Sequence, residues 1–91
     1  MAGLVGRTSP MPKTLHSPRH EALVACLIDQ RKRANVTQAE LASKLGQYQS
    51  FVARAESGQR RIDVIEFLDW AEALGFDPKA IIKRLTSIEL K

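Results

Sequence analysis

Hydrophobic residues recur at intervals of three and four in several segments of this chain, which is the spacing of one face of an α-helix. The clearest case covers residues 64–74, and a second long helix is predicted over residues 18–34. Shorter segments with the same pattern cover residues 37–45, 49–57 and 78–88. The apolar stripes of the two longest helices are Leu23, Val24, Leu27 and Ile28, and Val64, Phe67, Leu68, Ala71 and Leu74. The pattern therefore predicts an all-α chain of five helices.

Local start and stop signals agree with these boundaries. A Ser or Asp before Pro starts a helix, because Pro lacks an N–H that would be unpaired at the first helical position. A Thr or Asp followed three residues later by Glu forms a capping box. Gly or Asn tolerates the left-handed backbone that ends many helices. The start signals are Ser17-Pro18, Thr37 with Glu40, Asp63 with Glu66, and Asp77-Pro78, and the stop signals are Asn35, Gly46 and Gly75.

Composition limits the class of protein. The 91 residues suit one small domain, and an apolar fraction of 44% is enough for a helical core. The sequence has no apolar run long enough to span a membrane and no signal peptide. Cys26 is the only cysteine, which excludes an internal disulfide and a cysteine-based zinc site. We expect a cytoplasmic protein with a flexible leader at residues 1–16 and one domain at residues 17–91.

Positive charge is concentrated in the middle of the chain. Residues 21–62 carry seven basic and four acidic side chains, whereas residues 63–91 carry four basic and six acidic ones. The whole chain has a formal net charge of +4. This distribution favours a domain that turns one face toward a polyanion.

The most informative stretch, residues 37–58, is predicted to fold as two short helices around a tight bend at Gly46. In the second helix, Val52 and Ala55 share one side at about 100° per residue, with Phe51 at the edge of that side. The opposite side carries Gln49, Ser50, Ala53 and Arg54. Gln and Arg can make paired hydrogen bonds to adenine and guanine edges in the major groove of DNA.

This stretch resembles the helix-turn-helix of the lambda-repressor-like family, in particular the bacterial regulators of the XRE type. The pattern departs from the family at Tyr48, where a Ser, Thr or Pro is usual, and at Ala55, which is usually larger. The resemblance extends over about residues 18–85 and implies a five-helix lambda-repressor-like DNA-binding domain. The matching positions are Thr37, Gln38, Glu40, Leu41, Ala42, Leu45, Gly46, Gln49, Ser50, Val52, Glu56 and Gly58.

The resemblance and the helical periodicity together assign roles in DNA binding. We expect the exposed side of the second helix to read bases, and other residues to contact phosphates and fix the register without reading sequence. An alternative use of the leader is as a basic arm on DNA, through Arg7 and Lys13. The base-reading set is Gln49, Ser50, Ala53 and Arg54, and the phosphate set is Gln38, Lys44, Tyr48, Arg60 and Arg61.

Two further expectations concern contacts between protein groups. Glu56 falls beside Val52 on the inward side of its helix and needs a cation there, so we expect an ion pair with Arg31. Trp70 is expected at the edge of the core or at a partner surface. The last helix carries more apolar surface than a small domain usually hides, which predicts a homodimer. The expected interface is Phe76, Ile81, Ile82, Leu85 and Ile88.

The sequence contains no set of residues that would support catalysis. It has no phosphate loop, no metal-binding spacing and no plausible catalytic triad, so we expect no enzyme, cofactor or metal. Cys26 has no neighbouring histidine within a turn, and His20 is expected near the surface. The predicted function is transcriptional regulation, as a repressor that occupies a double-stranded DNA operator. Alternatives are an antitoxin or restriction–modification controller with the same fold, and a protein-interaction adaptor that has lost DNA binding.

Overall fold

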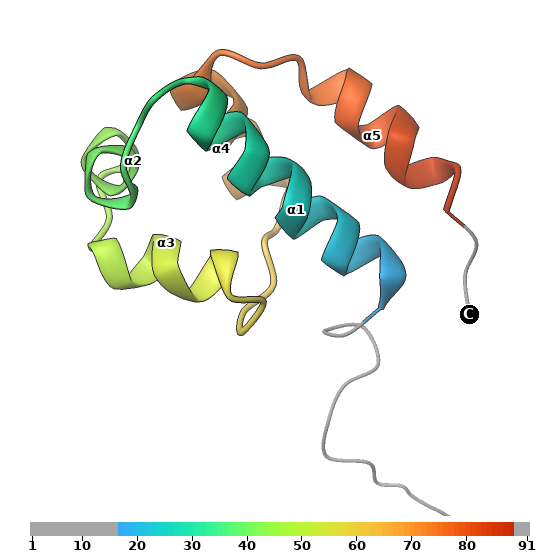
Figure 1. The fold of residues 1–91 in the computed structure, drawn as a ribbon, viewed down its shortest axis with the longest axis horizontal. Helices are drawn as coiled ribbons and strands as arrows, with labels where there is room; N and C mark the ends of the chain where they lie inside the picture. The colour runs from blue at the N-terminus through green and yellow to red at the C-terminus, as the bar shows by residue number, and fades with distance from the viewer. Residues whose placement is uncertain (1–16, 89–91) are drawn as a thin grey trace, which may run out of the picture.

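The computed structural model describes residues 17–88, which form five α-helices (Figure 1). The predicted all-α fold is confirmed. The expected leader at residues 1–16 lies outside the described residues. The helices are α1 (Pro18–Arg33), α2 (Gln38–Leu45), α3 (Gln49–Glu56), α4 (Val64–Leu74) and α5 (Pro78–Thr86).

Helix α1 crosses the middle of the domain, with α2 and α3 on one side and α5 on the other (Figure 1). Helix α1 packs against α3 on one side and against α5 on the other. Helices α1 and α5 run in opposite directions, so the start of α1 lies beside the end of α5. Arg19 joins these two ends, because its Nε donates to the carbonyl oxygens of Leu85 and Ile88, each at 3.1 Å. None of the helices within residues 17–88 is long and apolar enough to cross a lipid bilayer.

The predicted helix signals are present as hydrogen bonds. Ser17 Oγ accepts from the backbone N–H of His20 at 3.1 Å. In the first capping box, Thr37 Oγ1 accepts from the Glu40 N–H at 3.0 Å, and Glu40 accepts from the Thr37 N–H at 2.8 Å. Asp63 and Glu66 form the second box at the start of α4. The three predicted stop residues are left-handed, with φ of 60° at Asn35, 68° at Gly46 and 80° at Gly75.

The core is built around four side chains that are almost completely buried, one each from α1, α2, α3 and α4. They are Leu27, Leu41, Val52 and Trp70. Small residues beside them, such as Ala42 and Ala55, leave room for the indole within the same cluster. The expectation that Trp70 lies at the core edge or at a partner surface is therefore wrong, because its side chain is 0% exposed.

The apolar stripe of α4 is rotated from its predicted position. Phe67, Trp70 and Ala71 are buried, whereas Val64 is 71% exposed and Leu68 is 45% exposed. Val64 and Leu68 instead line a groove that α5 borders. His20 also differs from expectation. It is buried, because the end of α5 packs against the start of α1.

Candidate nucleic-acid interface

Helices α2 and α3 are held at a fixed angle by a short turn and a shared apolar contact. Gly46 supplies the left-handed turn, and the N–H of Gln47 donates back to the carbonyl oxygen of Ala42 at 2.9 Å. Leu41 on α2 and Val52 on α3 are both 0% exposed and belong to one cluster. The side of α3 opposite Val52 is consequently presented to solvent in one orientation.

The predicted base-reading residues lie on this outer side of α3. Gln49, Ser50 and Arg54 are exposed, and Ala53 between them is half-buried. Within residues 17–88, the Arg54 guanidinium forms no ion pair. A surface of this kind offers amide, hydroxyl and guanidinium groups that can meet the edges of base pairs.

Tyr48 stands at the cap position of α3 and is 84% exposed. In the described part of the chain its side chain makes no capping hydrogen bond, as expected from its departure from the usual Ser, Thr or Pro. The first N–H groups of α3 therefore have no side-chain cap, and Tyr48 instead projects its phenol from the end of the helix. Backbone N–H groups at a helix start favour an anion.

The predicted ion pair between Arg31 and Glu56 is present and shielded. Arg31 Nε donates to Glu56 Oε2 at 2.6 Å, and Nη2 donates to Oε1 at 2.9 Å. The side chains are 12% and 6% exposed. The hydrogen bonds to Glu56 raise the pKa of Arg31 above its ordinary value, against the opposing effect of burial. The pair fixes the end of α3 to α1.

Gln38 joins the same network, which differs from the role expected for its side chain. Its Nε2 donates to Glu56 Oε1 at 3.0 Å, so the amide group turns inward and not toward a phosphate. The reason is that Glu56 has acceptor sites left after it binds Arg31. The backbone at the start of α2 remains the part of Gln38 that faces an anion in our prediction.

Arg60 also differs from its expected role as a phosphate contact. Its Nη1 and Nη2 donate to the two carboxylate oxygens of Glu66, each at 3.1 Å. The carbon at the centre of its guanidinium lies 4.4 Å from the centre of the Phe51 ring. Arg60 is therefore held by protein groups. Lys44 and Arg61, the other basic members of the predicted set, are exposed.

Most of the expected dimer surface on α5 is covered within one chain. Ile81 is 6% exposed, and Phe76 and Leu85 pack against the core. Ile88 is half-buried, and Ile82 alone among the five is exposed. These residues are covered because α5 closes the core over α1 and α4.

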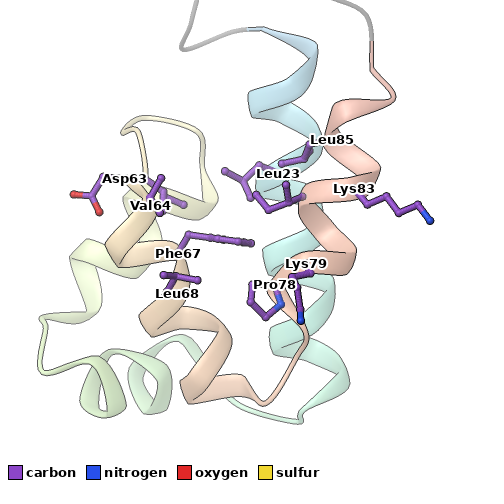
Figure 2. Close-up of a pocket in the computed structure, with 11 residues that line it drawn as sticks. Leu23, Asp63, Val64, Phe67, Leu68, Pro78, Lys79, Lys83 and Leu85 are labelled. Atoms are coloured by element: carbon purple, nitrogen blue, oxygen red, sulfur yellow. The ribbon is translucent and has the colours of Figure 1, made fainter.

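An apolar groove lies between α4 and α5, where the sequence predicted a buried stripe (Figure 2). It has a volume of about 410 Å³. Figure 2 shows the Phe67 ring directed into the space between the two helices, with Val64 at one edge and Pro78 at the other. The apolar lining is completed by Leu23, Ile62, Leu68, Ile82 and Leu85, and the charged residues at the rim are Asp63, Lys79 and Lys83.

Comparison with known proteins agrees with this architecture. The helix-turn-helix family matches residues 27–81, which is more than half of the chain. No curated protein matches the sequence. A solved XRE-family-like protein from Pseudomonas syringae pv. tomato is 45% identical, with a TM-score of 0.75 over 82% of this chain and 92% of its own.

Two other solved structures are more distant. The restriction–modification controller protein C.AhdI from Aeromonas hydrophila is 27% identical, with a TM-score of 0.63 over 68% of this chain and 94% of its own. The clp gene regulator ClgR from Corynebacterium glutamicum is 24% identical and shares the fold, with a TM-score of 0.68 over 80% of this chain and 96% of its own.

Proposed function

The chain belongs to the XRE family of helix-turn-helix DNA-binding regulators, and from that premise we propose that it represses transcription by occupying an operator that α3 reads in the major groove. The outer side of α3 supports this proposal most directly. The Gln49 and Arg54 side chains are exposed there. On the opposite side of the helix, Val52 and Ala55 are buried and hold α3 against the core. Side chains that read bases must project from a rigid element, because small displacements cost specificity.

Each residue on or near this outer side of α3 is assigned either to bases or to phosphates. Gln49, Ser50 and Arg54 face base edges, and Ala53 approaches a thymine methyl group. Lys44, Tyr48 and Arg61 contact phosphates around them, together with the backbone N–H groups at the starts of α2 and α3. The phosphate contacts supply affinity for any DNA, and the α3 side chains supply preference for one sequence.

Selection of bound sequences from a random pool of DNA duplexes tests this proposal. The expected result is one short consensus, bound with an affinity that falls steeply as salt rises. Failure to enrich any sequence would contradict base reading. Absence of salt-dependent binding to any duplex would instead favour the interaction adaptor.

A reporter gene with the selected sequence placed over its promoter then tests repression. Expression should fall when the protein is produced and recover when the operator is scrambled. Increased expression from the same arrangement would mean that the protein activates transcription.

A second candidate function is control of a restriction–modification system. The 27% identity to C.AhdI over almost the whole of that controller favours it over the antitoxin alternative. Both candidates use the same α3 surface. Neighbouring genes for an endonuclease and a methyltransferase, with the selected operator upstream of them, would identify a controller.

We further propose that the protein binds DNA as a homodimer. One recognition helix reads only a few base pairs, and two copies related by a two-fold axis double the information. The groove between α4 and α5 is the best-supported surface for this pairing. Val64 and Ile82 are exposed at its edges and can fill the groove of the second copy.

The charges around the groove are complementary between two copies. Asp63 lies on the α4 side of the rim, and Lys79 and Lys83 lie on the α5 side. A two-fold axis places the same patch on both sides of the interface, so α4 of each copy can face α5 of the other. Asp63 of each copy would then lie opposite the two lysines of the other.

A further inference from the structure

Arg60 is a cation with two protein partners on different elements. Glu66, on α4, receives two parallel hydrogen bonds from its guanidinium, and Phe51, on α3, lies beneath the flat face of the same group. The Arg60 and Glu66 side chains are 29% and 26% exposed, so both are mostly shielded from water. Glu66 is itself fixed, because its carboxylate also accepts from the Asp63 N–H at 3.1 Å in the capping box of α4.

The Phe51 ring is enclosed from a second direction by Trp70. The two ring centres are 6.0 Å apart with an angle of 35° between the ring planes. Trp70 is fully buried and belongs to α4, so it provides a fixed surface. Phe51 therefore connects Arg60, in the loop between α3 and α4, with the centre of the core.

This arrangement adds to the packing of Val52, which also lies in the first turn of α3. The helix has only eight residues, and its cap residue Tyr48 makes no side-chain capping bond among the described residues. Helices of this length are marginal without tertiary contacts. Phe51 lies in the first turn, next to Ser50 and two residues after Gln49.

We infer that Arg60 is a positioning residue for base reading, not a phosphate contact: it holds Phe51 against Trp70 and so fixes the first turn of α3. Glu66 neutralises its charge and orients the guanidinium over the ring. This inference rests on the proposed reading of DNA by α3. It predicts that Arg60 affects sequence preference more than general affinity.

The experiment compares operator and random DNA binding for Arg60→Lys, Arg60→Gln and Glu66→Gln, using the sequence selected from the random pool. Lys keeps the positive charge but lacks the planar fork and the flat face. If Arg60 positions α3, Arg60→Lys lowers the ratio of operator to random affinity by about tenfold, the order of one mismatched base pair. Arg60→Gln lowers the same ratio and leaves the salt slope on random DNA unchanged.

Glu66→Gln provides an independent arm. Gln can keep the capping box, but it removes the charge that orients Arg60. The expected result is a lower operator-to-random ratio, although the variant has one more net positive charge and should hold random DNA at least as tightly. An equal fall of the operator-to-random ratio in the Arg60 and Glu66 variants would show that the two residues act through one shared contact.

A spectroscopic measurement separates positioning from general loss of structure. Trp70 is the only tryptophan in the chain, so its fluorescence reports the packing of Phe51. Emission should shift in Arg60→Lys while circular dichroism shows an unchanged helix content. The matched control is Arg33→Lys, because Arg33 pairs with Asp29 on the exposed end of α1, and it should change none of these signals.

Two results would overturn the inference. One is an Arg60→Lys protein with the same operator preference and Trp70 emission as the unmodified chain. The other is an Arg60→Gln protein whose salt slope falls by about 0.9 with equal losses on all sequences, which is the behaviour of a phosphate contact. Lack of sequence preference in the unmodified chain is a separate outcome, since it would contradict the proposed function itself.

Discussion

At the scale of single residues, three ion pairs differ in how far their side chains are exposed to water. This difference decides how much each pair contributes to the free energy of unfolding. Arg31 and Glu56 are nearly buried, Arg60 and Glu66 are partly shielded, and Arg33 and Asp29 are 72% and 54% exposed. Water and salt screen an exposed pair, whereas a buried charge that loses its partner cannot return to water. The sequence could identify Glu56 as needing a cation because its neighbour Val52 marks the inward side of the helix.

The first prediction follows from this difference and uses two equivalent substitutions in α1. Arg31→Met leaves the Glu56 carboxylate buried beside Gln38, and should lower the free energy of unfolding by about 3–5 kcal/mol. Arg33→Met removes an exposed pair and should cost about 1 kcal/mol or less. Urea unfolding measures both. Equal small losses would show that the Arg31–Glu56 pair does not hold α1 to α3.

A second prediction at this scale concerns Arg54, whose guanidinium has no ion pair within residues 17–88. Arg54→Ala should weaken operator binding by about 1–3 kcal/mol and relax the preference at one base pair. Lys44→Ala, at a proposed phosphate contact, should instead weaken all sequences alike and reduce the salt slope by about 0.9. Titrations on operator and random duplexes distinguish them. The same loss on both duplexes for Arg54→Ala would argue against base reading.

At the scale of helices, boundaries could be predicted because they depend on neighbours in sequence. The capping boxes at Thr37 and Asp63 and the left-handed residues Asn35, Gly46 and Gly75 all have local causes. The buried side of α4 could not be predicted in the same way. A stripe through Val64 and one through Trp70 both have helical spacing, and only the arrangement of α2 and α5 decides which is covered.

The third prediction concerns the start of α2. Hydrogen bonds from the Thr37 N–H, and then those with the Thr37 side chain, lower the pKa of Glu40 below its ordinary value of 4.5. Because this pKa is lower in the folded state than in the unfolded state, the ionised carboxylate stabilises the fold at pH values above the unfolded pKa. This contribution is lost as the pH falls through the folded pKa. Glu40→Gln can keep the capping bond but cannot titrate.

Urea unfolding across the acidic range tests this sign. The unmodified chain should be the more stable of the two at neutral pH, and its advantage should shrink as the pH falls below about 4.5. Because Glu40 is exposed, the difference should be small. A constant difference at every pH would show that ionisation of Glu40 does not contribute to the start of α2.

At the scale of the whole molecule, the sequence predicted the exposed side of α3 but misplaced the apolar surface. The helix-turn-helix could be recognised because its turn, caps and inner positions lie within one continuous stretch. The groove between α4 and α5 depends on how two separate helices meet. Apolar counts alone could not show that Ile81 is buried while Val64, seventeen positions earlier, is exposed.

The last prediction uses two neighbouring apolar residues on the first turn of α4 to test the proposed dimer. Val64 is 71% exposed and lines the groove, whereas Ile65 is 66% exposed and does not line it. Val64→Asp would place a charge in the apolar interface and should weaken pairing by about 2 kcal/mol or more. Ile65→Asp adds the same charge beside the groove and should leave the dimer intact. Neither change should affect folding, because both side chains are exposed.

Light scattering with and without operator DNA gives the readout. The unmodified chain and Ile65→Asp should form dimers that bind two half-sites with recognition helices about 34 Å apart. Val64→Asp should be monomeric and should bind a full operator no better than a single half-site. If both variants stay dimeric, the groove is not the interface. If the unmodified chain remains monomeric at high concentration even on operator DNA, the dimer itself is excluded.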